Sequence, residues 1–369
     1  MTTTRFMGHY DVAIGGGGPA GSVAALQLAR AGAAVLLLER QTRHERRLGE
    51  TLPPQATRIL QQLNVWNEFL ATAPIPAYAN ASAWGSDELH FDDFIFGAQG
   101  PGWHIDRGRF EAMLCTLAER AGTTVLHDSP IKSVHMNGRG CRLHFARDCS
   151  LHTANADFLI DASGRGRNRW QPHSERRQVD RLIGVALTAR VSAARDVSSY
   201  TLVESVHDGW FYSAQVSTTE IVACYMTDAD LYARARRSGS YFQSRLARAP
   251  HTRQRLEAAA AVPHPRCAVA GSSLRTTAAG ENWIAIGDAA FSCDPLSASG
   301  LITAVESGVH AANIIAKTGN PSLHSWSGYL SSAFTSYLAQ RKQYYQMERR
   351  WPASAFWQRR QHPAADLAP

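Results

Sequence analysis

Residues 11–40 read DVAIGGGGPAGSVAALQLARAGAAVLLLER, and this stretch decides the fold. The short apolar run Asp11–Ile14 predicts a strand, and the glycines that follow it predict a tight turn. Alanine and leucine dominate Ser22–Arg30, which predicts a helix. A second apolar strand, Ala33–Leu38, then runs directly into the acidic residue Glu39.

The glycines of the turn follow the pattern GxGxxG, with Gly16, Gly18 and Gly21 at its three glycine positions. Gly16 permits the tight turn, Gly18 lets a phosphate group approach the backbone, and Gly21 lets the helix pack closely on the strand. The N–H groups at the start of the helix, around Ala20, carry a partial positive charge that favours phosphate. Glu39 lies 23 residues after Gly16, where a carboxylate can bind ribose hydroxyls. This order of elements predicts a dinucleotide-binding fold.

The composition is that of a globular enzyme, with 44% hydrophobic and 19% charged residues. The 369 residues exceed what one core usually needs, so we expect two interleaved domains or a domain with a cap. The net charge of +7 comes mostly from arginine and is typical of a solvated basic surface. The alternative is attraction to phosphates or to an acidic partner. Because no dense basic run is interleaved with aromatic residues, we expect no nucleic-acid partner.

The six cysteines form no CxxC pair and none has a histidine at zinc spacing, so we expect no metal site and a reducing compartment. The first ten residues are polar and lack the apolar core of a signal peptide. Polar residues interrupt the apolar stretch Val23–Leu38, which argues against a membrane span. We therefore expect a cytoplasmic protein without a membrane partner.

Four further stretches place glycine and charged residues next to predicted strands or helices. They read RRLGETLPP at 46–54, WHIDR at 103–107, DASGR at 161–165 and GDAAFSCDPLSASGL at 287–301. The apolar run just before the last stretch predicts a strand that leads into Asp288, and a loop then leads into a predicted helix. The N-terminal end of such a helix can stabilise negative charge on a bound group.

Together with the glycine turn, these stretches resemble those of flavoproteins with the para-hydroxybenzoate hydroxylase fold. Within that fold the chain is similar to the branch of flavin-dependent halogenases and their non-halogenating relatives. The resemblance implies FAD as the cofactor, with Arg107 near its phosphate and ribose groups and Asp288 at its ribityl chain and pyrophosphate. The cofactor-binding candidates are Gly16, Gly18, Ala20, Gly21, Glu39, Arg40, Arg47, Arg107, Ile131, Asp288, Ser299, Gly300 and Leu301.

The expected fold class is α/β, with a Rossmann-like FAD domain interleaved with an antiparallel-sheet substrate domain and followed by a helical C-terminal tail. The alternating runs 182–191, 209–216 and 220–226 predict the strands of the antiparallel sheet. The tail from Tyr329 to Arg360 predicts a helix that ends before Pro352. The predicted boundaries are 1–80, 106–180 and 271–320 for the FAD domain, 81–105 and 181–270 for the substrate domain, and 321–369 for the C-terminal segment.

The resemblance also implies the chemistry. Reduced flavin reacts with O2 to give a C4a-hydroperoxide, which hydroxylates an electron-rich ring or oxidises a halide. Halogenases of the branch carry a lysine after the GE(S/T)LPP loop and a WxWxIP sequence in the substrate sheet. Here residues 55–105 contain no lysine, and residues 209–216 read GWFYSAQV. Both differences favour monooxygenation of an aromatic ring over halogenation.

The stretch RWPASAFW at 350–357 resembles the tail of flavoproteins that oxygenate a tryptophan within a partner polypeptide during tryptophylquinone cofactor biogenesis. The predicted substrate is therefore an aromatic ring, with the indole of a protein or peptide as its most specific form. The electron donor is NAD(P)H or an external flavin reductase. Three alternatives stay open: a flavin-dependent halogenase, an FAD-dependent reductase of the geranylgeranyl reductase type, and a non-catalytic flavoprotein chaperone.

Candidates for proton transfer are Glu50, in the loop beside the expected flavin ring, and His104, which precedes Arg107. The alternative is that Glu50 binds backbone amides and that His104 is a packing residue. Trp84, Trp210 and Tyr212 are candidates for the substrate cavity, although aromatic residues in a sheet more often belong to the core.

Overall fold

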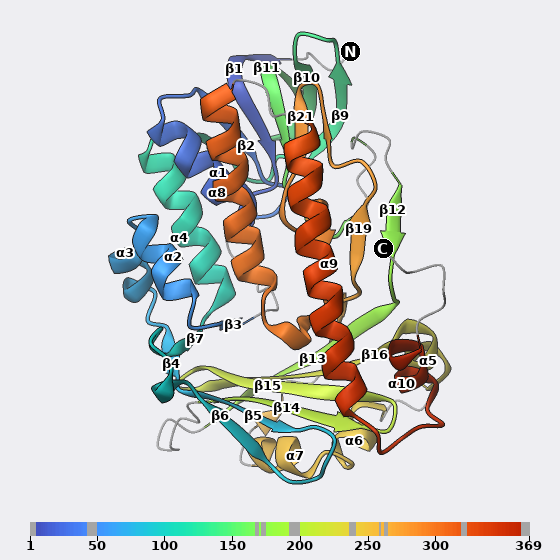
Figure 1. Ribbon diagram of the computed structural model, residues 1–369. Coiled ribbons are helices and arrows are strands. Elements are labelled where there is room, and N and C mark those ends of the chain that lie inside the picture. The colour runs from blue at the N-terminus through green and yellow to red at the C-terminus, as the bar shows by residue number, and fades with distance from the viewer. Residues whose placement is uncertain are drawn as a thin grey trace.

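The computed structural model describes residues 5–42, 50–166, 170, 175–191, 200–235, 241–257, 260–261, 265–318 and 323–362. They form a helix-covered central sheet and a second, mainly antiparallel sheet that lies across its lower end in Figure 1. The predicted α/β class with a Rossmann-like part and an antiparallel sheet is confirmed.

The central sheet has the strand order β20-β21-β11-β1-β2-β8. Its strands are β1 (Arg5–Gly15), β2 (Val35–Leu38), β8 (Thr124–Leu126), β11 (Ser150–Asp161), β20 (Ala279–Gly280) and β21 (Trp283–Ala285). Strand β1 pairs in parallel with both β11 and β2. Two further strands, β9 (Ile131–Met136) and β10 (Cys141–Arg147), extend the sheet along the first half of β11. All four residues of β2 are buried, because helices or chain cover both faces of a parallel sheet.

Helix α1 (Pro19–Arg30) packs between α4 (Arg107–Arg120) and α8 (Gly300–Thr318) against the central sheet. Helices α2 (Ala56–Gln62) and α3 (Trp66–Ala71) lie beside α4 in Figure 1. Below them is a small sheet of β3 (Thr51–Leu52), β7 (Gly102–His104) and β4 (Ile75–Ala77). Another small sheet joins β12 (Arg176–Gln178), β19 (Ser273–Arg275) and β22 (Phe291–Ser292).

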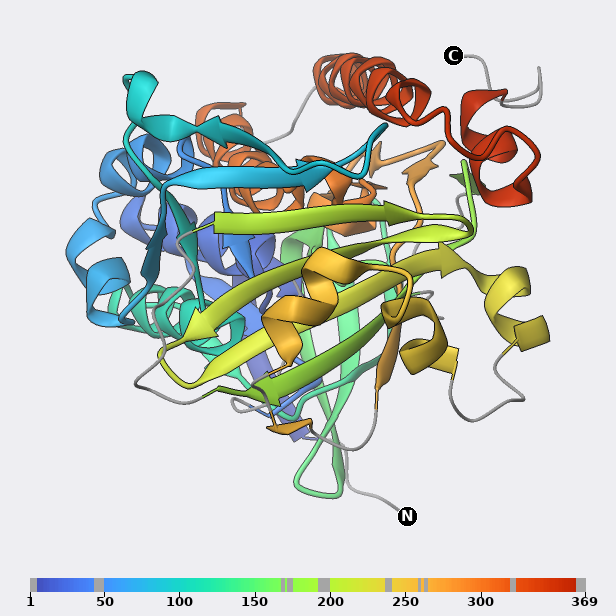
Figure 2. The same cartoon turned by 90° about the horizontal axis from the view of Figure 1, so that it is seen from below.

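The second sheet has the order β17-β13-β16-β15-β14-β5-β6, and β18 also pairs with β13. Its strands are β5 (Ala79–Ala83), β6 (His90–Asp93), β13 (Leu182–Arg190), β14 (Tyr200–Val206), β15 (Gly209–Ser217), β16 (Glu220–Asp228), β17 (Ala260–Ala261) and β18 (Arg266–Val269). Helix α5 (Ala229–Ala235) follows β16, while α6 (Tyr241–Leu246) and α7 (Pro250–Leu256) lie on one face of the sheet, as Figure 2 shows.

The C-terminal segment forms α9 (Leu323–Met347) and α10 (Ala355–Gln361). Helix α9 runs beside the central sheet and continues to the second sheet (Figure 1). Aromatic side chains of the tail, among them Tyr345, Phe356 and Trp357, pack on the face of the second sheet opposite α6 and α7. The helix predicted to end before Pro352 thus ends at Met347, and α10 begins beyond the proline.

No helix in the described ranges combines the length and the apolar character that a membrane crossing requires. All six cysteines are free thiols, of which Cys149 and Cys267 are exposed.

Candidate functional site

A cavity of about 580 Å³ lies where the central sheet meets the second sheet. Its walls come from the carboxyl ends of β1, β2, β11 and β21, from the starts of α1, α4 and α8, and from strands β13, β15, β16 and β18. Ligands of open α/β sheets bind outside the carboxyl ends of the strands. The volume is in the range of sites that hold organic ligands.

The glycine turn forms one end of the cavity, with Gly16, Gly18 and Ala20 on its wall. Gly16 has a φ of +115°, and a Cβ there would lie 2.3 Å from the carbonyl oxygen of Ala162. A Cβ on Gly21 would lie 2.0 Å from the carbonyl oxygen of Gly16, so Gly21 serves the packing of α1 rather than the wall. Gly18 is the N-cap of α1 and offers no side-chain cap, so the start of the helix has N–H groups directed toward the cavity end.

Glu39 ties the glycine turn to the end of β2. Its Oε2 accepts the N–H of Gly17 at 2.6 Å and its Oε1 accepts the N–H of Gln41 at 2.9 Å. The side chain is buried yet still borders the cavity, as does Arg40 beside it. Glu39 therefore fixes the shape of the turn and also presents a carboxylate to the cavity.

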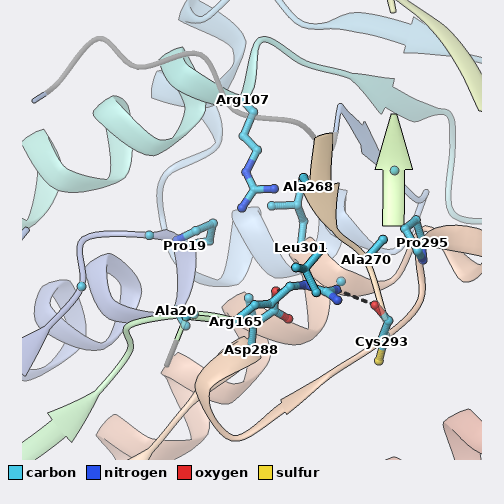
Figure 3. Close-up of a pocket in the computed structure, with 18 of the residues that line it drawn as sticks. Pro19, Ala20, Arg107, Arg165, Ala268, Ala270, Asp288, Cys293, Pro295 and Leu301 are labelled. Atoms are coloured by element: carbon cyan, nitrogen blue, oxygen red, sulfur yellow. Dashed lines mark hydrogen bonds and ion pairs between the residues drawn. The ribbon is translucent and has the colours of Figure 1, made fainter. Parts of the chain in front are cut away.

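Asp288 lies on the cavity wall in the short helix η3 (Gly287–Ala289). Its Oδ2 accepts a hydrogen bond from Nε of Arg165 at 2.9 Å. The same guanidinium donates to the carbonyl oxygens of Gly271 at 2.7 Å and of Cys293 at 2.5 Å. Figure 3 shows Arg165 beside Asp288, with its bond to Cys293 drawn as a dashed line. Arg165 joins three separate segments at the cavity. It stands in the DASGR stretch, but it was not among the residues predicted from the sequence to bind the cofactor.

Arg107 borders the cavity from the first turn of α4, which Asp106 caps by accepting the N–H of Arg109 at 3.1 Å. The Nε of Arg107 donates to Glu111 one turn later at 2.8 Å. Burial lowers the pKa of Arg107, but Glu111, with smaller contributions from the charges of Asp288 and Glu50, raises it above its ordinary value, so the guanidinium stays charged. In Figure 3 this side chain reaches toward the space that Pro19 and Leu301 also border.

The start of α8 completes the wall with Gly300 and Leu301. The turn before it, η4 (Pro295–Ser297), is capped by Asp294, and Ala298 has a left-handed φ of 50°. Ser299 does not line this cavity: its hydroxyl lies 2.6 Å from that of Ser297.

Two other cofactor candidates are placed differently. Ile131 lies beneath the turn, where its Cδ1 would be 2.9 Å from a Cβ on Gly15, and it does not border the cavity. Arg47 lies outside the described residues.

Glu50 and Tyr212 both lie at one end of the cavity, the end to which the second sheet contributes. Both border it, and Glu50 is buried. The Tyr212 hydroxyl lies 2.7 Å from that of Thr51. Burial, followed by the charge of Glu50, raises the pKa of Tyr212 well above its ordinary value, so the phenol stays protonated. Cys224 and Met226 continue this end, which is apolar and rich in sulfur.

His104 does not border the cavity. Its Nε2 lies 2.9 Å from the Thr201 hydroxyl, and the ring is fully buried. Burial, together with the charge of Arg255, lowers the pKa of His104 to about 3. The imidazole is therefore neutral around pH 7, and its position suits the packing alternative better than proton transfer.

Trp84 and Trp210 also lie away from the cavity, in the cluster between the second sheet and the C-terminal tail. The Trp210 indole N–H donates to the Tyr345 hydroxyl at 3.1 Å, and that of Trp84 donates to the Tyr344 carbonyl at 2.8 Å. The structure thus brings Tyr212 to the cavity and directs the two tryptophans to the tail.

The residues around the cavity fit FAD. The start of α1 can bind pyrophosphate, Glu39 can bind ribose hydroxyls, and Arg107 can neutralise phosphate charge. Asp288 and the start of α8 border the same space. FAD carries a pyrophosphate between two aromatic ring systems, and the groups around the cavity offer partners for its phosphates, its ribose and a ring.

Comparison with known proteins gives a consistent result. A family model described as FAD binding domain matches residues 9–323. LodB of Marinomonas mediterranea, described as an FAD-dependent oxidoreductase, is 29% identical over 362 residues, which cover 96% of this chain and 97% of LodB. The crystal structure of CmlS, a flavin-dependent halogenase, is 26% identical with a TM-score of 0.86, covering 98% of this chain and 69% of CmlS. QhpG, a peptidyl tryptophan dihydroxylase, shares the fold at 21% identity and a TM-score of 0.75, over 98% of this chain and 80% of QhpG.

Proposed function

The chain belongs to the FAD-binding domain family, and on that premise we propose that it is a monooxygenase that hydroxylates an aromatic ring, specifically an indole. Membership of this family of halogenase-like and monooxygenase-like flavoproteins makes the chain an FAD-dependent oxidoreductase. The reaction type and the substrate are the proposal.

One observation carries the proposal: a single cavity is bordered both by the dinucleotide residues and by the second sheet. Gly16, Asp288 and Gly300 stand along one part of it, while Tyr212 and Met226 stand along the other. A ring that packs on Tyr212 and Met226 would therefore share the space with the cofactor. Aromatic and thioether side chains favour such a ring through stacking and sulfur contacts.

Bound FAD would supply the redox chemistry, in which two electrons and O2 give one oxygen atom for the ring and one for water. The protein's part is to bind, orient and exclude water. The side chains of Tyr212, Cys224 and Met226 suit the packing of a ring at this end of the cavity. We infer that the electrons come from NAD(P)H or from an external flavin reductase, because the sequence offers a single GxGxxG turn.

A hydroxylated aromatic ring must lose a proton from the carbon that receives oxygen. Glu50 borders the cavity, and the hydroxyl of its neighbour Thr51 contacts that of Tyr212. We infer that this carboxylate accepts the proton. Tyr212 stays protonated and serves to orient the ring.

Hydroxylation is favoured over halogenation by the chain itself. Residues 55–105 contain no lysine, and the second sheet carries Gly209–Val216 in place of a WxWxIP sequence. Halogenation is the second candidate, since the similar structure of CmlS is that of a flavin-dependent halogenase.

An indole held within a polypeptide is the form of substrate that we favour. QhpG, which shares the fold, is described as a peptidyl tryptophan dihydroxylase, and the RWPASAFW tail resembles that kind of flavoprotein. The net charge of +7 would attract an acidic polypeptide.

Mass spectrometry of products tests the proposal directly. The FAD-loaded protein is supplied with NADH, a flavin reductase and isotopically labelled O2. Its substrates are free tryptophan and an acidic tryptophan-containing peptide, each with and without bromide. We expect labelled oxygen on the indole of the peptide, with the same product when bromide is present.

Each alternative gives a different result. A brominated product would establish halogenation. In a separate arm without O2 and with an alkene as substrate, a gain of hydrogen would establish a reductase. Tight binding of the peptide with no change in its mass over complete flavin turnover would indicate a chaperone. Any of these outcomes would refute the proposed hydroxylation.

A further inference from the structure

Asp294, which borders the cavity, is almost fully buried and is held from three sides. Its Oδ1 accepts the N–H of Leu296 at 2.8 Å. Its Oδ2 accepts Nε of Arg341 at 3.1 Å and the hydroxyl of Tyr345 at 2.8 Å. Its own N–H donates to the hydroxyl of Tyr337 at 2.7 Å. The residue that opens the loop before α8 is therefore anchored to helix α9.

The three anchoring side chains stand four residues apart on α9, which places them on one face of the helix. The middle one, Arg341, also binds Asp180, with Nη2 2.7 Å from Oδ2. The Oδ1 of Asp180 in turn accepts the N–H of Leu182, the first residue of β13. One helix face therefore connects the cavity loop with the start of a strand of the second sheet.

A second connection reaches the same sheet through Tyr345. Its hydroxyl accepts the indole N–H of Trp210 in β15 at 3.1 Å while it donates to Asp294. The family model ends at residue 323, where α9 begins, so these contacts come from a helix beyond the part that the model matches. Figure 1 shows α9 passing from the level of the central sheet to that of the second sheet.

The charge on Arg341 is secured by its two acidic partners. Burial alone lowers the pKa of Arg341, but Asp294 and Asp180 together raise it above its ordinary value. A buried arginine between two carboxylates contributes little net stability, because its desolvation offsets much of the attraction. Its geometry is nevertheless strict, since loss of either acid removes one of the two partners of a buried charge.

We propose that Arg341 and Tyr345 are positioning residues for the FAD site. They hold Asp294, and through it the loop Pro295–Gly300 and the start of α8, at a fixed place relative to the second sheet. This inference rests on the proposed function only in that FAD must occupy the cavity. It does not depend on the substrate or on the reaction type.

Two conservative variants test the inference by measuring FAD binding without any substrate. Arg341→Lys keeps the charge but cannot bridge both acids, and Tyr345→Phe removes one hydroxyl. We expect the FAD dissociation constant, measured by calorimetry, to rise roughly tenfold for Arg341→Lys and less for Tyr345→Phe. We also expect the visible absorption bands of bound flavin to shift in both variants, because the start of α8 moves relative to the ring.

Arg359→Lys is the matched control. Arg359, although more exposed, bridges two acids in the same manner, with Nη1 2.8 Å from both Asp228 and Asp230, and none of the three borders the cavity. The control should lower the unfolding temperature of the FAD-free protein while its FAD dissociation constant stays within about twofold of wild type.

Unchanged FAD affinity and unchanged flavin bands in Arg341→Lys, with only a lower unfolding temperature, would show a purely structural role and overturn the inference. If Arg341→Lys does not fold, unchanged affinity in Tyr345→Phe has the same meaning. A wild-type protein that binds FAD but forms no hydroxylated product would refute the proposed reaction and leave this test intact.

Discussion

The hydroxyl groups of Thr51 and Tyr212 lie 2.7 Å apart, and this contact joins strand β3 beside the central sheet to strand β15 of the second sheet. Both residues border the cavity. The pair therefore links the two parts of the molecule at the cavity wall.

Removing one hydroxyl of this pair should lower the free energy of unfolding more than removing both hydroxyls together. Thr51→Val leaves the partly buried Tyr212 hydroxyl without this partner and should lower the free energy of unfolding by about 1 kcal/mol. The double variant with Tyr212→Phe should cost less than the sum of the single changes. Urea denaturation of all three variants measures this coupling. For comparison, Tyr225 lies on the other face of the sheet, and its hydroxyl donates to Asp208. Tyr225→Phe should therefore change the free energy of unfolding and leave the KM for an aromatic substrate unchanged. A coupling energy of zero would show that the contact contributes nothing.

Arg165 should matter more for FAD binding than for folding. Arg165→Lys keeps the charge but cannot reach Asp288 and the carbonyls of Gly271 and Cys293 together. We expect the FAD dissociation constant to rise by about tenfold or more. Arg176→Lys is the control, because Arg176 binds the backbone carbonyls of Asp288 and Ala289 without bordering the cavity. Equal losses of FAD affinity in the two variants would contradict a specific role for Arg165.

A methyl group at Gly300 should block the cofactor and spare the fold. No heavy atom lies within 4 Å of a Cβ added there, and Gly300 borders the cavity. Gly300→Ala should therefore leave the unfolding temperature of the FAD-free protein at the wild-type value while FAD affinity falls at least roughly tenfold. Gly328→Ala adds a methyl group to open space on α9, away from the cavity, and should not change FAD affinity. Wild-type affinity in Gly300→Ala would place the cofactor elsewhere.

His104 should make the protein sensitive to acid rather than take part in catalysis. Its pKa is about 3 in the folded state, against an ordinary value of 6.5, so between these values the unfolded chain binds the proton more readily. The stability tied to the neutral ring is fully present above pH 6.5 and is lost as the pH falls toward 3, at up to about 1.4 kcal/mol per pH unit. His104→Gln should flatten the change in urea-unfolding free energy from about pH 7 to about pH 5. It should leave the pH profile of kcat unchanged, and an altered kcat profile would restore His104 as a candidate for proton transfer.

The sequence was sufficient for the parts of the fold that depend on local patterns. The strand, glycine turn, helix and strand of residues 11–40 have local signals, and the structure places β1, α1 and β2 there. Glu39, Arg107, Asp288 and Gly300 were selected from three distant stretches, and all four border one cavity.

Other features depend on contacts between distant segments and have no local signal. Arg165 acquires its role from acceptors at residues 271, 288 and 293, which only the tertiary structure brings together. Trp210 and Tyr212 are two residues apart and lie on the same face of β15, and the sequence pattern does not show which partner each side chain meets on that face. Trp210 meets Tyr345 of the tail, while Tyr212 meets Thr51 at the cavity.

The strand order of the central sheet also governs when the cofactor can be acquired. Strand β1 pairs with β11, so that Arg5 lies opposite His152. The last residues of the chain that line the cavity are Leu301 and Ala304 in α8. A growing chain that has left the ribosome with its glycine turn alone therefore has a phosphate-binding loop without the opposite wall. FAD retention therefore requires synthesis of the chain through the start of α8, and a product truncated before α8 would lack this part of the cavity wall.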